Sequence, residues 1–191
     1  MSSSILVTYA TRYGSTQEVA EAVAATLREC GLEVAIGPMR DVRTLEGYHA
    51  VVLGASLYMF HWHKDALRFL SRYREAITQR PVAVAIFALG PVHADEKEFQ
   101  GSREQLEKEL AKFPWLTPAA IAIFGGKFDP QKLGFPFNLL PALKNMPASD
   151  VRDWTAIRAW ASNLAAMLQP AALEDGTPKT GLVASDSKGV A

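Results

Sequence analysis

Three hydroxyl side chains surround one glycine in the segment Thr11-Arg-Tyr-Gly-Ser-Thr16, which lies between an apolar run and a helical pattern. Free amide hydrogens at the start of a helix, together with nearby hydroxyls, bind anions. The segment contains no lysine, no cysteine and no G-x-G-x-x-G, which argues against a nucleotide P-loop, a thiolate phosphatase and a dinucleotide fingerprint. We therefore predict a site for a phosphate that is held rather than transferred, such as that of FMN. The alternative is a polar turn in which Ser15 or Thr16 caps the helix.

A second unusual segment runs from Gly54 to His63, with the sequence Gly-Ala-Ser-Leu-Tyr-Met-Phe-His-Trp-His. Its aromatic residues, Tyr58, Phe60 and Trp62, alternate within a predicted loop. A flavin ring needs apolar or aromatic side chains against its faces, and small residues let the backbone approach its edge. The segment, together with Gly90 in a later loop, meets both needs, although each aromatic could instead be ordinary packing.

The pair His61 and His63 has the right residue type for a metal or for proton transfer. A metal site would need a third ligand, and the only other histidines are His49 and His93. We therefore expect no metal. Hydrogen bonding at the start of the following helix is one interpretation of the pair, and proton transfer beside a substrate is the other.

Five apolar runs alternate with helical patterns and must position these segments. A chain of this kind predicts an α/β fold with a parallel sheet covered on both faces, and ligands on such sheets bind where the strands end. The loops after the first, third and fourth runs are then the site candidates. We predict strands at 5–9, 32–36, 50–55, 82–87 and 119–124, and helices after Thr16, over 66–77, from near Ser102 with a capping box to Gln105, and over 151–168 with Ser149 or Asp150 as cap.

Composition limits the class of protein. The 191 residues suit one domain, predicted over 1–169, followed by a disordered tail at 170–191 rich in Gly, Ser, Pro and Lys. Twenty basic and twenty acidic residues balance, which gives no electrostatic case for nucleic acid. We see no signal peptide and no spanning segment, so we expect a cytoplasmic protein, with peripheral membrane contact still open.

The apolar stretch 127–149 is broken by prolines and follows the fifth run. Because the prolines prevent one long amphipathic helix, we expect a loop packed over the sheet edge. The alternative is a docking surface for a quinone, a membrane or a hydrophobic substrate.

The segment Tyr-Ala-Thr-Arg-Tyr-Gly-Ser-Thr resembles the flavodoxin phosphate loop. The segment 54–63, and the segment 152–158 at the last helix, resemble the branch of that superfamily that includes the menaquinone-dependent protoporphyrinogen oxidases. The resemblance covers residues 4–168. It implies a three-layer flavodoxin-like fold with strand order 2-1-3-4-5, and FMN as cofactor. Carried over by position, it implies that the phosphate binds Thr11, Arg12, Tyr13, Gly14, Ser15 and Thr16, and that the ring lies between Ser56, Leu57, Tyr58, Met59 and Ala88, Leu89, Gly90, Pro91.

The resemblance also implies an FMN-dependent oxidoreductase, with a porphyrinogen-type substrate and a quinone or redox protein as partner. Two features depart from it. Typical flavodoxins are strongly acidic whereas this chain is neutral, and the oxidase branch has a basic, aromatic insertion where 127–149 carries few charges. The alternatives are an electron carrier between proteins and, less favoured, a flavin-free interaction scaffold.

Overall fold

The structure is a computed structural model that describes residues 4–58, 61–80, 82–91, 95–132, 134 and 139–169, without the side chains of Tyr58 and Leu143. The tail expected at 170–191 lies outside the described residues. Of the helices in the described part, none is both long enough and apolar enough to cross a bilayer.

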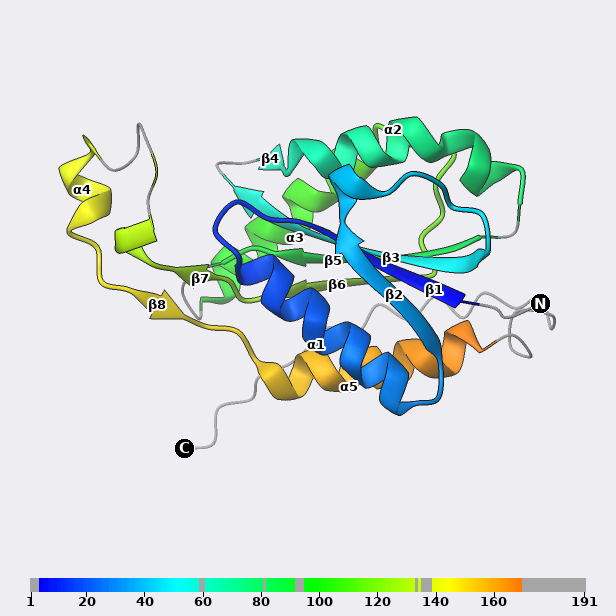
Figure 1. The fold of residues 1–191 in the computed structure, drawn as a ribbon. Helices are drawn as coiled ribbons and strands as arrows, with labels where there is room; N and C mark the ends of the chain where they lie inside the picture. Colours follow the sequence, from blue (N-terminus) through cyan, green and yellow to red (C-terminus); the bar gives the residue numbers. More distant parts are fainter. Residues whose placement is uncertain are drawn as a thin grey trace.

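A parallel sheet forms the centre of the molecule (Figure 1). The sheet confirms the predicted fold class, because its order, β2-β1-β3-β5-β6, is 2-1-3-4-5 when the five predicted strands are counted along the chain. The sequence did not predict β4 (His61–Trp62), a short strand that turns back antiparallel against the end of β3. The five parallel strands are β1 (Ser4–Ala10), β2 (Glu33–Pro38), β3 (Tyr48–Tyr58), β5 (Ala83–Leu89) and β6 (Ala120–Phe124).

Helices cover both faces of the sheet, as the continuous apolar strands require. One face packs against α1 (Ser15–Glu29) and α5 (Trp154–Leu168), and the other against α2 (Lys64–Thr78) and α3 (Glu96–Leu110). Side chains alternate between the two cores, so Val7 and Val52 pack on the α1 side while Leu6 and Leu53 pack on the α2 side. A short 3-10 helix, η1 (Met39–Asp41), follows β2.

Two helix starts differ from the prediction because other residues, both aspartates, cap them. Helix α3 begins at Glu96, where the Asp95 carboxylate accepts a hydrogen bond from the Lys97 amide at 2.7 Å. Ser102, the predicted start, lies inside the helix and donates its hydroxyl to the Glu98 carbonyl. Helix α5 is capped by Asp153 instead of Ser149 or Asp150. The predicted boundaries were wrong where a nearby residue also had suitable capping chemistry.

Gly54 in β3 has a packing role. A Cβ there would lie 2.0 Å from Cζ of Phe87 on the neighbouring strand β5, a distance that no real side chain tolerates. The Phe87 ring fills this space and also stacks edge-on against Trp160 of α5. The small residue that the sequence suggested for close approach to a ligand therefore admits a core aromatic instead.

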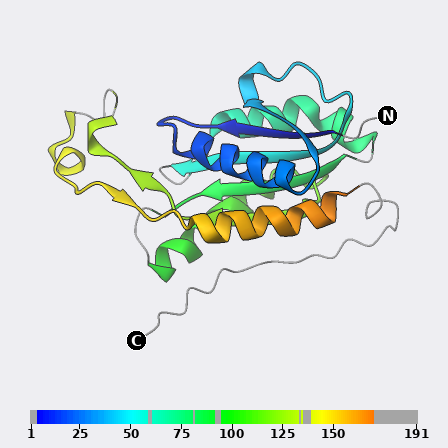
Figure 2. The ribbon, with the colours of Figure 1, turned by 60° about the horizontal axis from the view of Figure 1, so that its bottom comes forward.

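Residues 127–150 leave the domain beyond the end of β6 as a projecting extension, which we call the arm (Figures 1 and 2). We expected a loop packed over the sheet edge, whereas the described part of the arm projects away from the sheet (Figure 2). Its two legs pair as a separate antiparallel sheet, with Lys127 opposite Asp150 and Phe128 opposite Ser149. Its described elements are β7 (Lys127–Phe128), η2 (Pro130–Lys132), α4 (Pro141–Lys144) and β8 (Ser149–Asp150).

Candidate functional site: a cavity between the turn before α1 and the arm

The turn between β1 and α1 is held by one of its own hydroxyls. The Gly14 amide donates to Oγ1 of Thr11 at 2.9 Å, and Gly14 adopts a left-handed conformation with φ of 92°, which glycine accepts without strain. Gly14 is itself the N-cap of α1, and no side chain caps the helix. The alternative in which Ser15 or Thr16 acts as N-cap is therefore not what the structure contains.

An uncapped first turn presents amide hydrogens to a ligand. The first amides of a helix have no intrahelical acceptor, and here the sequence supplies no capping side chain in their place. Thr16 adds a second signal, because it is fully buried and its hydroxyl has no hydrogen-bond partner within the described part of the chain. Buried hydroxyls are normally paired, so this donor fits an anion such as the phosphate of FMN.

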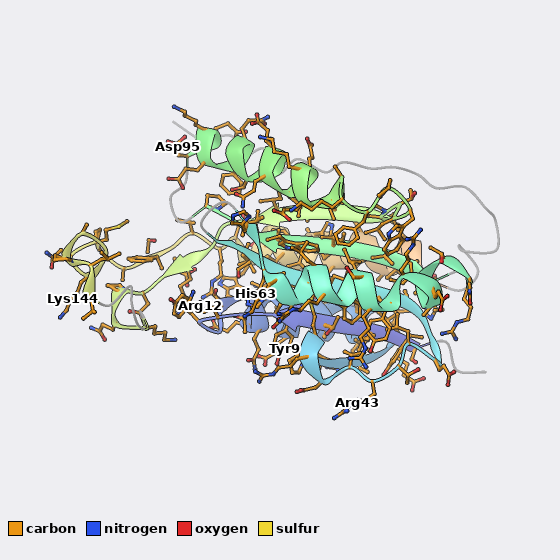
Figure 3. The ribbon with its side chains drawn as sticks, turned by 90° about the horizontal axis from the view of Figure 1, so that it is seen from above. Tyr9, Arg12, Arg43, His63, Asp95 and Lys144 are labelled. Atoms are coloured by element: carbon orange, nitrogen blue, oxygen red, sulfur yellow. The ribbon has the colours of Figure 1, made fainter. Side chains whose placement is uncertain are left out.

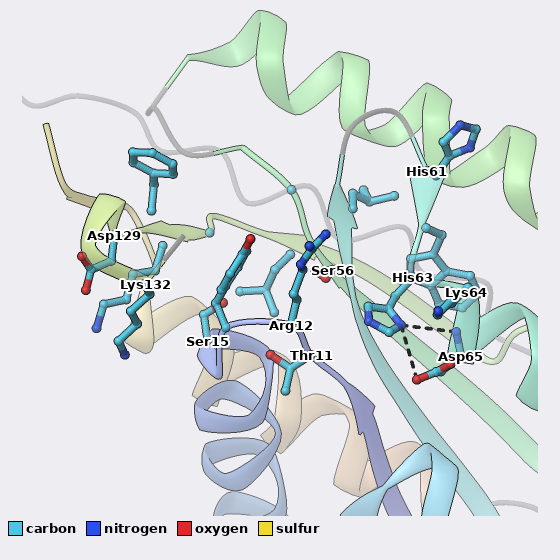
Figure 4. A pocket seen from close by; sticks show the side chains of 18 residues that line it. Thr11, Arg12, Ser15, Ser56, His61, His63, Lys64, Asp65, Asp129 and Lys132 are labelled. Carbon is cyan, nitrogen blue, oxygen red and sulfur yellow. Dashed lines mark hydrogen bonds and ion pairs between the residues drawn. The ribbon is translucent and has the colours of Figure 1, made fainter. Parts of the chain in front are cut away.

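A cavity of about 690 Å³ opens beside this turn, where the strands β1, β3 and β5 end and the arm begins (Figure 4). A volume in this range suits a cofactor or a cofactor with its substrate. Figure 3 shows that Arg12 and His63 lie at this end of the sheet, while Lys144 lies at the far end of the arm. Eight of the residues predicted for the site line the cavity, namely Thr11, Arg12, Tyr13, Ser15, Ser56, Leu57, Leu89 and Gly90.

The remaining predicted site residues are not among the described residues that line the cavity. Gly14 is the N-cap of α1, and Thr16 is buried in the first turn of that helix. Ala88 and Pro91 are buried, and the Pro91 carbonyl accepts a hydrogen bond from the Gly126 amide at 2.6 Å. The Tyr58 side chain, Met59 and Phe60 lie outside the described residues. Gly90 faces the cavity, but a Cβ there would meet the Ser102 hydroxyl of α3 at 2.6 Å.

His63 is the N-cap of α2 and contributes its ring to the cavity wall. Its Nδ1 accepts a hydrogen bond from the Asp65 amide at 3.2 Å (Figure 4). Burial lowers the pKa of His63 below its ordinary value, against the raising effect of Asp65, so the neutral ring is favoured. Because Nδ1 accepts, the proton of the neutral ring is on Nε2. The side chain is therefore a fixed hydrogen-bond donor.

His61 has a different environment, which sequence could not show. Its ring lines the cavity and is largely exposed, and its Nδ1 lies 3.4 Å from Oε1 of Glu109 in α3. Glu109 is nearly buried and also binds Nζ of Lys112 at 2.6 Å. Within the described residues no group of three His, Cys, Asp or Glu residues is arranged to hold a metal.

Trp62, between the two histidines, is 1% exposed and packs into the core on the α2 side while also lining the cavity. Its indole nitrogen is buried with no partner in the described part of the chain. Of the three aromatics expected to stack on a ring, it is the one that the structure describes at the cavity.

The arm supplies the wall that the predicted site residues did not include. Gly126, at its base, and four arm residues line the cavity together with the turn before α1, and two of the four are lysines. The residues are Gly126, Lys127, Phe128, Asp129 and Lys132. The sequence signal available was the apolar, proline-broken composition of 127–149, which suggested a docking surface but not its position.

Comparison with known proteins agrees with the fold. A family model described as a flavodoxin domain matches residues 6–137. Protoporphyrinogen IX dehydrogenase (quinone) from Escherichia coli strain K12 is 24% identical over 173 residues, covering 84% of this chain and 93% of that protein.

Solved structures give the same picture of the fold. Oxidised flavodoxin 1 from Bacillus cereus superposes with a TM-score of 0.58 at 17% identity, covering 87% of this chain and all of that one. A point mutant of flavodoxin from Pseudomonas aeruginosa gives a TM-score of 0.55 at 16% identity, covering 86% of this chain and 98% of that one.

Proposed function

The chain belongs to the flavodoxin domain family, and from this premise we propose that it is an FMN-dependent dehydrogenase of a porphyrinogen-type substrate with a quinone as electron acceptor. FMN is the cofactor that the family indicates. Bound FMN supplies a group that accepts a hydride or single electrons and passes them on. The chain's own residues hold this group, shape the space beside it and orient the substrate.

The observation that carries the proposal is the composition of the cavity wall on the arm. Phe128 gives an apolar surface, and the charged side chains beside it are two lysines, Lys127 and Lys132, and one carboxylate, Asp129. A porphyrinogen is a wide apolar macrocycle with carboxylates at its edge, and its two parts match Phe128 and the two lysines. The similarity to protoporphyrinogen IX dehydrogenase (quinone), which extends over 93% of that protein, supports the same substrate class.

The phosphate loop and the histidine at α2 have separate tasks in this proposal. The uncapped first turn of α1 and the buried Thr16 hydroxyl would bind the FMN phosphate, while Ser56, Leu57 and Leu89 would border the ring. The fixed Nε2–H of His63 would donate a hydrogen bond to an acceptor atom in the cavity. The role of the protein is thus binding and orientation, with no side-chain nucleophile.

The first experiment separates the proposed enzyme from its alternatives. Freshly purified protein should show flavin absorbance, or gain it on incubation with FMN. Under anaerobic conditions it should then oxidise protoporphyrinogen only when a quinone is supplied. Reduction by a flavodoxin reductase without porphyrinogen turnover would identify an electron carrier instead. If the protein binds no FMN, only the interpretation as a flavin-free interaction scaffold remains.

A further inference from the structure

Arg152 is a buried cation at the root of the arm, and the cavity does not use it. Its side chain is 3% exposed. Nε and Nη2 donate to the two oxygens of Asp150 at 2.7 and 2.5 Å, and Nη1 donates to Oε2 of Glu18 at 2.7 Å. The guanidinium also lies over the Trp154 ring, 4.7 Å from its centre. A planar guanidinium paired in this way has a single orientation.

The partners of Arg152 connect the phosphate helix with the cavity wall. Glu18 is in the first turn of α1, and its own amide donates to the carbonyl of Gly14 in the phosphate loop at 3.1 Å. On the other side, Asp150 in β8 is opposite Lys127 in β7, with 3.9 Å between Oδ2 and Nζ. A continuous set of contacts therefore leads from the phosphate loop, through Glu18 and Arg152, to a lysine of the cavity.

Backbone contacts hold the same root in place. The Val151 amide donates to the Gly126 carbonyl at 3.1 Å, and the Gly126 amide donates to Pro91 in the loop after β5. The return leg passes so close to Gly125 that a Cβ there would be 2.0 Å from the Val151 carbonyl oxygen. Beyond this root the arm projects away from the sheet (Figure 2), so its direction depends on the contacts at its base.

Arg152 also compensates the negative charge of Glu18. A carboxylate in the first turn of α1 lies close to the place where an anionic phosphate would bind, and two negative charges repel each other. The ion pair with the nearly buried Arg152 turns the Glu18 carboxylate toward the arm and compensates its charge.

We propose that Arg152 is a positioning residue that couples the arm to the phosphate helix, so that FMN binding at α1 restrains the arm over the cavity. The coupling rests on the proposed FMN site. Because coupling between two sites is reciprocal, a substrate that binds the arm also strengthens FMN binding. The effect needs both ion pairs of Arg152, to Glu18 and to Asp150.

Limited trypsin digestion of the full chain, with and without FMN, tests the coupling without measuring activity. Lys132 and Lys144 on the arm are the cleavage sites to follow by mass spectrometry. In the wild-type protein FMN should slow cleavage at both by about fivefold or more, the low end of usual coupling. In Arg152→Met cleavage should be faster, and FMN should no longer slow it. The matched control is Arg158→Met, an exposed arginine in α5, the helix that begins two residues after Arg152, and it should behave as wild type.

A second variant keeps the test decisive if Arg152→Met fails to fold. Glu18→Gln leaves the pair of Arg152 with Asp150 intact and weakens only the connection to α1. It should bind FMN, measured by quenching of flavin fluorescence, yet lose the FMN-dependent protection of the arm.

The outcomes separate the coupling from the proposed reaction. FMN binding that leaves arm cleavage unchanged in the wild type, or that protects Glu18→Gln as fully as wild type, overturns the coupling alone. FMN-dependent protection without porphyrinogen turnover overturns the proposed reaction and leaves the coupling standing. A wild-type chain that binds no FMN removes both.

Discussion

The hydroxyl oxygen of Thr11 accepts a hydrogen bond from the Gly14 amide, with 2.9 Å between the two atoms. This bond closes the turn that leads into α1. Thr11→Val keeps the shape of the side chain and removes the acceptor, and we expect FMN affinity to fall roughly fivefold, the equivalent of about 1 kcal/mol. Titration of the apoprotein with FMN measures it. Thr44→Val is the control, because Thr44 accepts from the Glu46 amide in an exposed turn. Equal losses in both variants would contradict the prediction.

Gly14→Ala tests the left-handed turn. At φ of 92° a Cβ introduces strain of about 1–2 kcal/mol, and relief of that strain would displace the first amides of α1. We expect lower stability and weaker FMN binding. Gly31→Ala, at φ of 84° after the same helix, should lower the free energy of unfolding by a similar amount while leaving FMN affinity unchanged. Urea unfolding and FMN titration of the two variants give the comparison.

The partly buried histidine at α2 predicts a pH dependence of stability. Burial lowers the pKa of His63 in the folded protein, and the charges of Lys64 and Arg12 act in the same direction while Asp65 opposes them. A depressed folded pKa means that the unfolded chain binds the proton more readily, so folding stability falls as the pH drops below the unfolded value of 6.5.

Replacement of His63 by asparagine keeps a good N-cap acceptor and removes the titration. The stability difference between wild type and His63→Asn, measured by urea unfolding of the apoprotein, should move in favour of the variant between about pH 7.5 and pH 5. A difference that stays constant over this range would show that the ring is not held neutral.

Lys132 on the arm tests recognition of substrate carboxylates. It lines the cavity together with Phe128, whereas Lys144 lies at the far end of the arm (Figure 3). Lys132→Ala should raise the KM for the porphyrinogen about threefold to tenfold, as expected for loss of one charge-assisted contact, with the KM for the quinone little changed. Lys144→Ala should leave both values unaltered, and an equal effect of the two variants would point to a general change of charge.

Two exposed leucines on the arm, Leu139 and Leu140, are 67% and 49% exposed and suit contact with a lipid-like acceptor. Leu139→Ser with Leu140→Ser should reduce the rate with a long-chain quinone in vesicles by about fourfold or more, the scale of one lost buried methylene group. The rate with a short, water-soluble quinone should not change. Loss of both rates together would indicate damage to the site instead.

Much of the fold follows from local pattern. The apolar runs are long enough to be buried strands and are separated by helical periodicity, and this predicted the parallel sheet, while the resemblance to flavodoxins supplied its order. Helix boundaries were predicted less well, because Asp95 and Ser102 both have capping chemistry; in the structure Asp95 caps the helix, and Ser102 lies inside it beside Gly90.

The residues of the cavity also fall into a group that the sequence could predict and a group that it could not. The hydroxyl-rich turn and the loops after β3 and β5 are each contiguous in sequence, and parallel strands bring their carboxyl ends together by necessity, so these lining residues could be named in advance. Pairs of side chains that are far apart in the sequence but in contact in the fold could not be predicted. His61 and Glu109 are 48 residues apart, and Arg152 and Glu18 are 134 apart.

The sequence by itself determined the strands, the presence of the helices and the hydroxyl-rich turn before α1, because these depend on residue types within a few positions of one another. Only the tertiary structure decided that Gly54 admits Phe87 rather than a ligand, and that the stretch after β6 extends as an arm whose Lys127 and Lys132 line the same cavity as the turn before α1. Those outcomes depend on which side chains compete for the same space after the chain has folded, and no local pattern records that competition.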